Sequence, residues 1–191
     1  MDKKSFLVVG AGAWGTALSI QLANNGLTVS LTSNDKDNLR AIANTKENER
    51  YLPGFQLPDA IKIEPDYAGC IASSSSVLVC VKSKYFLSAL QSLSTHMCSD
   101  QNLIWATKGL DSEKGRPLSE LVKQDFPKLK KTAVISGPSF AKDVAQGMPT
   151  AITLASENIE NLIDLADLLT GRSFRVYTST DIIGVQLGGV F

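Results

Sequence analysis

The sequence has few of the residues on which metal and redox sites depend. Its 191 residues include one histidine and three cysteines, and Cys70, Cys80 and Cys98 lack the C-x-x-C spacing of zinc or redox sites. No group of histidine, cysteine, aspartate or glutamate has metal-ligand spacing. We therefore expect no metal site, and we interpret Cys80, which lies within an apolar run, as a small core residue.

An excess of charge and a long apolar run are also missing. The 19 basic residues balance the 19 acidic ones, so electrostatics gives no reason to expect a nucleic acid or an anionic membrane as partner. No run reaches membrane-spanning length, and the first four residues pass into a strand pattern without the apolar region of a signal peptide. We expect a cytoplasmic protein without stable membrane insertion.

Glycines are present in an informative arrangement near the start of the chain. An apolar run ends in Gly10-x-Gly12-x-x-Gly15, and a helix-like pattern follows through Leu22. Gly10 allows a tight turn, Gly12 lets a pyrophosphate approach the backbone, and Gly15 lets the helix pack closely on the strand. The helix N-terminus then directs N–H groups at the phosphates. The motif predicts binding of NAD or NADP, against the alternative of a glycine-rich turn without a ligand.

Strand and helix patterns alternate along the chain. We expect strands at residues 4–9, 28–32, 61–63, 77–81, 103–106, 133–136, 151–155 and 175–177. We expect helices at residues 14–25, 36–43, 85–93, 118–126, 139–145 and 158–169, and loops at 51–58 and 73–76. This alternation predicts an α/β fold with a doubly wound, mostly parallel sheet, the Rossmann-like dinucleotide-binding fold.

The last residues suggest a second domain. With 43% apolar residues, a chain of this length can bury one core, or one core and part of another. A Rossmann domain supplies only part of a substrate crevice. We expect residues 1–180 to form the dinucleotide-binding domain, and the apolar residues 181–191 to begin a helix that leads into a second domain absent from this sequence.

Five blocks of sequence carry a family resemblance. They are Gly10-Ala-Gly-Ala-Trp-Gly-Thr-Ala17, Arg50-Tyr-Leu-Pro-Gly54, Thr107-Lys-Gly-Leu110, Gly137-Pro-Ser-Phe-Ala-Lys-Asp-Val-Ala-x-Gly-x-Pro-Thr150 and Asp181-Ile-Ile-Gly-Val-Gln-Leu-Gly-Gly189. In this order the chain resembles the bacterial NAD(P)-dependent glycerol-3-phosphate dehydrogenases. The resemblance implies reversible reduction of dihydroxyacetone phosphate to sn-glycerol 3-phosphate with NAD(P)H, for glycerophospholipid synthesis. It also implies a helical second domain.

Lys108 is the first candidate for substrate binding. It follows a predicted strand, so it stands at the carboxyl edge of the sheet, where it can place a positive charge near a substrate oxygen or phosphate. The alternative is a solvated surface lysine. The resemblance implies that Lys108 contacts both substrate and cofactor, that Gly137 and Ser139 contact the substrate, and that Ala141 contacts the cofactor. The alternative for Ser139 is a plain helix N-cap.

Other candidates concern the cofactor. Ala13 and Trp14 lie within the glycine motif that we expect to bind it. After the second strand, Ser33 stands where an acidic residue would favour NAD, and the acid Asp35 comes slightly late. Ser33, Asn34 and Lys36 could accept a 2′-phosphate, so we expect NADP, with use of NAD as well.

The turn after the strand at residues 77–81 departs from the family. The family usually has Pro-Ser there, and this chain has Lys82-Ser83. We include Tyr85 among the cofactor-binding candidates. Whether Ser83 or Tyr85 contacts the nicotinamide ring stays open.

No residue of the chain suits the role of general acid. His96 lies in a loop-like segment, and we interpret it as a surface residue. The resemblance places the acid/base at a lysine just beyond Phe191, so we expect no catalytic residue within the chain and no activity of the chain alone. The expected partner is a small phosphorylated substrate, and a homodimer stays open.

Two other functions are possible. Another dehydrogenase of the β-hydroxyacid type, acting on phosphogluconate or hydroxyisobutyrate, would share the fold, although its glycine turn differs. A non-catalytic NAD(P)-sensing domain would keep the cofactor site without chemistry. The sequence beyond Phe191 would separate the enzyme from the sensor.

Overall fold

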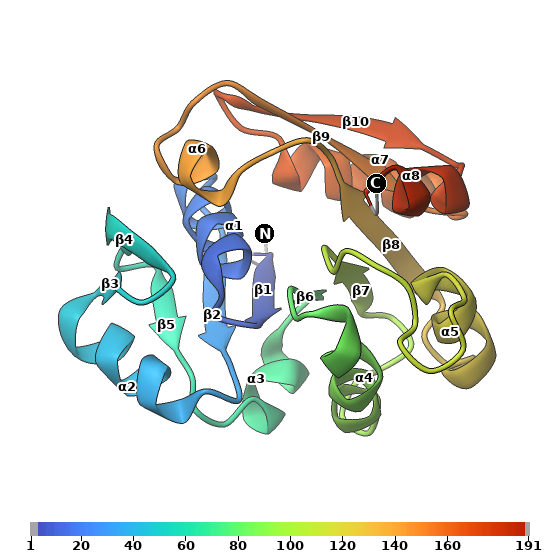
Figure 1. Cartoon of the computed structure of the whole chain (residues 1–191), viewed down its shortest axis with the longest axis horizontal. Coiled ribbons are helices and arrows are strands. Elements are labelled where there is room, and N and C mark those ends of the chain that lie inside the picture. The colour runs from blue at the N-terminus through green and yellow to red at the C-terminus, as the bar shows by residue number, and fades with distance from the viewer. Residues whose placement is uncertain (1–3, 190–191) are drawn as a thin grey trace.

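The computed structural model describes residues 4–189, in which one mixed sheet lies between layers of helices (Figure 1). Within these residues the sheet has eight strands in the order β10-β9-β8-β7-β6-β1-β2-β5. The strands are β1 Ser5–Val9, β2 Thr28–Thr32, β5 Ile61–Ile63, β6 Ser76–Val79, β7 Asn102–Trp105, β8 Lys131–Ser136, β9 Thr150–Ala155 and β10 Phe174–Ser179. All neighbours pair in parallel except β8 and β9. The predicted doubly wound, mostly parallel sheet is confirmed.

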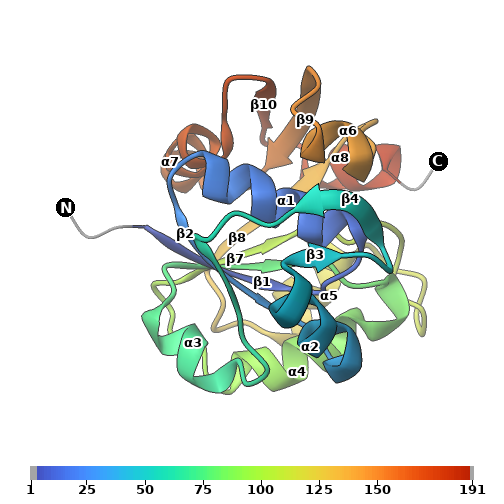
Figure 2. The same cartoon turned by 90° about the vertical axis from the view of Figure 1, so that its left-hand side faces the viewer.

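Helices cover both faces of this sheet, as Figure 2 shows for α1 and α7 against α3 and α4. The helical elements are α1 Ala13–Asn24, α2 Lys36–Thr45, α3 Ala68–Ser73, η1 Ser83–Tyr85, α4 Phe86–Ser94, α5 Leu118–Asp125, α6 Ala141–Ala145, α7 Ile159–Leu169 and α8 Ile182–Gly188. Side chains of α1, α2, α6 and α7 pack in one core, and those of α3, α4, α5 and α8 in the other. No described helix is long and apolar enough to span a membrane.

The central strand β1 is buried on both faces. Phe6 and Val8 point into the first core, while Leu7 and Val9 point into the second. This explains why β1 is a continuous apolar run rather than an alternating one. From β1 the chain leads to β2 on one side, and it later returns to β6 on the other side. The direction of winding therefore reverses between β1 and β6, and ligands bind at such a switch point.

The expectation of a loop at residues 51–58 was wrong in part. A small antiparallel hairpin forms there, from β3 (Glu47–Asn48) and β4 (Leu52–Gln56). Pro53 suggested a loop, but proline is tolerated in an edge strand because such a strand leaves N–H positions unpaired. The hairpin therefore lies beside the main sheet rather than within it.

Smaller differences concern element ends. The short helix α3 was not expected from the sequence, and its fully buried Ile71 packs on the second core. Helix α6 begins at Ala141, two residues later than expected, and β10 is longer than predicted. In α8 the Gln186 side chain accepts a hydrogen bond from the Ser119 backbone at 3.1 Å, which ties this helix to α5. The end of the expected interdomain helix, residues 190–191, lies outside the described residues.

Candidate cofactor site

Two glycines of the turn after β1 are required by close approach of the backbone. Gly10 has φ +117°, and a Cβ there would lie 2.6 Å from the carbonyl oxygen of Cys80. A Cβ on Gly15 would lie 1.9 Å from the carbonyl oxygen of Gly10. Both distances are far below a van der Waals contact, so a side chain at Gly10 would push the turn away from the segment after β6, and one at Gly15 would push α1 away from the turn. The packing roles predicted for Gly10 and Gly15 fit this geometry.

Gly12 differs because the space beside it is empty. It is the N-cap of α1 in extended conformation, and, apart from its two chain neighbours, no described residue has an atom within 4 Å of an added Cβ. The N–H groups of a first helical turn have no partner within the helix, and they carry the positive end of its dipole. No side chain caps this end of α1 in the structure. The turn therefore has both the space and the donors that a pyrophosphate requires.

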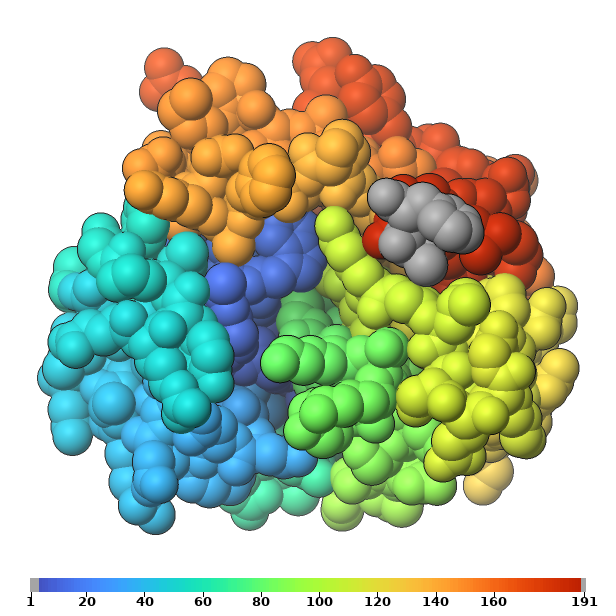
Figure 3. Space-filling model, viewed as in Figure 1, coloured from blue at the N-terminus to red at the C-terminus, as the bar shows by residue number. Residues whose placement is uncertain are grey.

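A cavity of about 600 Å³ lies beside this turn. Figure 3 shows a hollow at the centre of the molecule, between the blue segment that follows β1 and the green segment that follows β6. Five of the predicted cofactor residues line the cavity, namely Gly10, Gly12, Ser33, Asn34 and Tyr85. Asp35, Tyr51, Tyr67 and Lys82 line it as well. A larger, more open cavity of about 850 Å³ lies near Arg172. We place the site in the smaller cavity, because the glycine turn and the switch point meet there.

The other predicted cofactor residues do not line this cavity. Ala13 and Gly15 belong to the first turn of α1, and Trp14 packs against the first core. Ala141 begins α6 and packs on the same core. Helix α6 packs against α1, the helix that begins at the glycine turn.

Lys108 and Gly137 are brought together at the carboxyl edge of β7 and β8. The exposed Lys108 donates a long hydrogen bond from Nζ to the Gly137 carbonyl oxygen, at 3.4 Å. A Cβ on Gly137 would lie 3.1 Å from Cα of Ile152 in β9, so glycine allows close packing at this point. The two predicted substrate residues therefore share one edge of the sheet, as expected.

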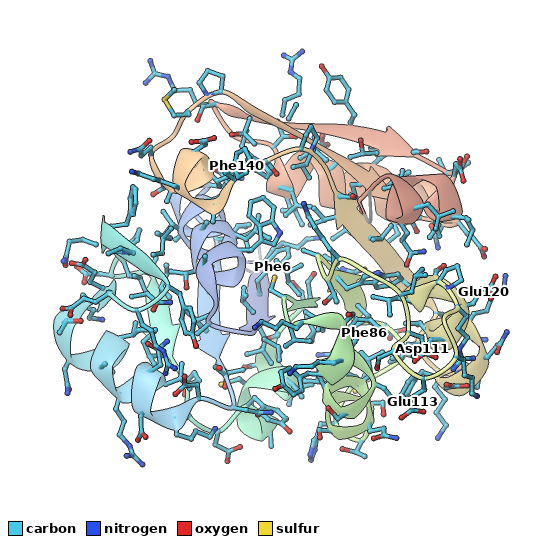
Figure 4. All side chains as sticks on the ribbon, viewed as in Figure 1. Phe6, Phe86, Asp111, Glu113, Glu120 and Phe140 are labelled. Atoms are coloured by element: carbon cyan, nitrogen blue, oxygen red, sulfur yellow. The ribbon has the colours of Figure 1, made fainter. Side chains whose placement is uncertain are left out.

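Ser139 does not cap a helix. Phe140 is the N-cap of α6, and it is 75% exposed (Figure 4). The Ser139 hydroxyl is buried and has no hydrogen-bond partner among residues 4–189. The alternative of a plain N-cap is therefore wrong. A buried hydroxyl without a partner is costly, and such groups occur at sites that bind a ligand.

A cluster of charged side chains follows Lys108, and the sequence analysis did not identify it. Arg116 Nε donates to Asp111 Oδ2 at 3.0 Å, and its Nη2 contacts Asp125 of α5. The cluster lies beside α5 in Figure 4, where Asp111 is labelled. The Glu113 backbone N–H and the Arg116 guanidinium hold the pKa of the Asp111 carboxyl below its ordinary value. These contacts brace the loop that carries Lys108.

Asn48 is a second residue that sequence reasoning missed. It is fully buried, and its Nδ2 donates to the Ala11 carbonyl oxygen at 3.0 Å and to Thr16 Oγ1 at 2.7 Å. Its Oδ1 accepts from Asn38 Nδ2 and from the Tyr51 backbone N–H, both at 3.3 Å. The hairpin is thereby tied to the glycine turn. An asparagine in a loop-like segment carries no sequence signal for this role.

The remaining titratable candidates lie as expected. His96 is exposed in the turn after α4, as predicted for a surface residue. Cys80 packs beside the first core at the cavity wall, and burial raises the pKa of its thiol. Within residues 4–189 no group of three or more histidine, cysteine, aspartate or glutamate residues could hold a metal ion.

A mostly parallel, doubly wound sheet with this glycine turn at its switch point defines a dinucleotide-binding domain of the Rossmann type. A family profile described as NAD-dependent glycerol-3-phosphate dehydrogenase N-terminus matches residues 5–162. The chain belongs to this family. The assignment favours the stated resemblance over the rival β-hydroxyacid dehydrogenases.

Relatives of known name agree with this assignment. A glycerol-3-phosphate dehydrogenase, NAD(P)+, from Pectobacterium atrosepticum is 45% identical over 186 residues, which are 97% of this chain and 55% of that protein. A crystal structure of glycerol-3-phosphate dehydrogenase from Coxiella burnetii superposes with a TM-score of 0.92 at 36% identity, covering 99% of this chain and 57% of that one. The Plasmodium falciparum enzyme, 24% identical with a TM-score of 0.86, shares the fold. The chain thus spans about half the length of these relatives.

Proposed function

We propose that this chain is the cofactor-binding part of an NAD(P)-dependent glycerol-3-phosphate dehydrogenase. The observation that carries the proposal is the open space beside Gly12, at the uncapped start of α1 and at the wall of the cavity. The bound cofactor would supply a hydride to the carbonyl carbon of dihydroxyacetone phosphate, and the reaction is reversible. We assign the protein to glycerophospholipid synthesis in the cytoplasm.

The cofactor would lie along the cavity, from the end lined by Ser33 and Asn34 after β2 to the turn after β6. The glycine turn with Ala13 and Trp14 would hold the pyrophosphate, because helix N–H groups point there. Ser33 and Asn34 line the end of the cavity after β2, where the adenosine ribose binds in this fold. Tyr85 lines the other end, and its half-exposed ring would contact the nicotinamide. We assign Ala141 to the cofactor on the resemblance alone.

The substrate would bind at the edge shared by Lys108, Gly137 and Ser139. The Lys108 ammonium would attract the substrate oxygens, and its long contact to Gly137 leaves it free to exchange partners. The Ser139 hydroxyl would donate to a substrate oxygen and so gain the partner that it lacks within the described residues. Lys108 would contact substrate and cofactor together.

Proton transfer would need a group outside this sequence. We propose that residues 1–180 form the dinucleotide-binding domain, and that residues 181–191 lead into a helical domain that contains the acid/base lysine. The partner would be a small phosphorylated substrate, and a homodimer is compatible with this reading. The chain alone would therefore bind cofactor without turnover.

Titration of the chain with NADPH and NADH, followed by nicotinamide fluorescence, tests the proposal. We expect saturable binding of both, and absence of binding at millimolar cofactor would contradict it. A chain extended to the length of the relatives should reduce dihydroxyacetone phosphate. If the extended chain bound cofactor without turnover, a sensing domain would be the better interpretation.

A further inference from the structure

Asp35 is an acid at the ribose end of the cavity, and both of its carboxylate oxygens are already engaged. Its Oδ1 accepts a hydrogen bond from the Asn38 backbone N–H at 3.0 Å, which caps α2. Its Oδ2 accepts from Arg50 Nη1 at 2.8 Å. In this fold an acid near the end of β2 selects NAD by binding the ribose hydroxyls. Asp35 is instead occupied by a helix N-terminus and a cation.

Arg50 reaches this place from the hairpin, between β3 and β4. Its Cζ lies 5.1 Å from the centroid of the Tyr51 ring, and Tyr51 and Asp35 both line the cavity. The Arg50 side chain is 61% exposed and does not itself line the cavity, but it contacts Asp35 and Tyr51, which do. A guanidinium has five N–H donors, and the Asp35 contact uses one of them. The remaining donors are available to a ligand.

We propose that Arg50 binds the 2′-phosphate of NADP and thereby sets the preference of this chain for NADP over NAD. The proposal rests on the proposed function, in which the cofactor occupies this cavity. Arginine suits the role because its planar fork matches two phosphate oxygens at once. Its charge also offsets the Asp35 carboxylate, which by itself would repel a phosphate.

The other cations of this region are less suited. The Lys36 Nζ donates to the backbone carbonyl oxygen of Pro65, and neither residue lines the cavity. Lys82 lines the cavity, but it follows Cys80 and Val81 at the end away from Ser33. The sequence analysis named Ser33, Asn34 and Lys36 for this phosphate. In the structure it is Arg50 that contacts Asp35, the acid at the end of the cavity that follows β2.

Two substitutions test the proposal in the chain as it stands. We expect Arg50→Gln to weaken NADPH binding at least tenfold, about 1.4 kcal/mol, and to change NADH binding less than threefold. Asp35→Asn keeps a good N-cap residue and removes the negative charge, so NADPH binding should tighten relative to NADH. Dissociation constants come from nicotinamide fluorescence. Displacement of NADPH by 2′-phospho-ADP-ribose or by ADP-ribose repeats the comparison with ligands that lack nicotinamide.

Arg40→Gln is the matched control. Arg40 is an exposed arginine of α2 that pairs with Asp37 at 3.0 Å, and Asp37, unlike Asp35, does not line the cavity. We expect it to leave both affinities unchanged. Thermal unfolding of each variant without cofactor shows whether the fold is retained.

Three outcomes would overturn the proposal, and they are distinguishable. An equal loss of NADPH and NADH binding in Arg50→Gln would assign Arg50 a structural role. Unchanged NADPH binding in that variant would exclude contact with the phosphate. Failure of the unsubstituted chain to bind either cofactor would overturn the proposed function, and this inference with it.

Discussion

The side-chain amide of Asn48 lies 3.0 Å from the carbonyl oxygen of Ala11 and donates a hydrogen bond to it. Ala11 stands between the first two glycines of the turn after β1, so the β3–β4 hairpin holds that turn in place. Through its side-chain oxygen Oδ1, Asn48 accepts a hydrogen bond from the backbone N–H of Tyr51, which lines the cavity. One buried side chain therefore connects the glycine turn at the cavity wall to the hairpin that carries Arg50.

Replacing Asn48 should affect both stability and binding. Asn48→Ala leaves the Ala11 carbonyl and the Thr16 hydroxyl without their buried partner, which costs about 1–3 kcal/mol for such groups. We expect a lower urea midpoint and weaker binding of NADPH and NADH alike. Asn44→Ala, at an exposed position of α2, is the control. Normal cofactor affinity in a folded Asn48→Ala variant would show that the turn does not need this brace.

Substitutions at two glycines of the turn should have different effects, one on cofactor binding and the other on stability. Gly12→Val places a side chain in open space, so the variant should fold with its stability nearly unchanged and lose cofactor binding. Gly15→Ala places a Cβ against the Gly10 carbonyl and should destabilise the fold itself. Circular dichroism and fluorescence titration distinguish the two effects. Unchanged affinity in Gly12→Val would mean that the turn does not contact the phosphates.

Lys108 should be essential for turnover in a chain extended to the length of the relatives. Lys108→Ala should lower kcat/KM for dihydroxyacetone phosphate by orders of magnitude, because the positive charge at the substrate edge is lost. Orientation of reactants can supply roughly 7–11 kcal/mol of a barrier. Lys114→Ala, an exposed position in the following loop, is the control. A fully active Lys108→Ala enzyme would refute this role.

The 191-residue chain should itself give no measurable turnover. Its cofactor and substrate edges would be present, but the group that protonates the alkoxide would not. Steady-state oxidation of NADPH, with the extended chain as reference, provides the measurement. Turnover of the bare chain at the rate of the extended one would contradict the split between two domains.

Asp111 should make stability sensitive to acid. Its pKa is lowered in the folded chain by the Glu113 backbone N–H and by Arg116. An aspartate in an unfolded chain has a pKa of about 3.9. The ionised carboxylate therefore stabilises the fold above that pH, and the contribution is lost as the pH falls through the lower folded value. We expect Asp111→Asn to be less stable at pH 7 and less sensitive to acid below about pH 4. Urea unfolding at pH 7 and at several values below about pH 4, with Asp59→Asn as an exposed control, measures the difference.

Several features of this fold depend on local sequence, and the sequence alone was sufficient to predict them. A strand buried on both faces must be apolar throughout, so β1 and β6 were found as continuous runs. A Cβ on Gly15 would clash with Gly10 within the same βα turn, and Gly10 itself has a positive φ, so this turn requires glycines at a fixed spacing. The carboxyl-edge position of Lys108 followed from strand order in the same way.

Tertiary structure alone decided the polar contacts between distant segments. Asn48 meets Ala11 across 37 positions of sequence, and Arg50 meets Asp35 across 15. No periodicity or spacing in the sequence predicts either pair. The position of the β3–β4 hairpin is set by its packing on other segments and not by its local sequence. Ser139 was expected at a helix start, and instead it precedes the helix with its hydroxyl buried. A hydrogen bond depends on where two groups finally lie, and only the packed sheet and helices decide that.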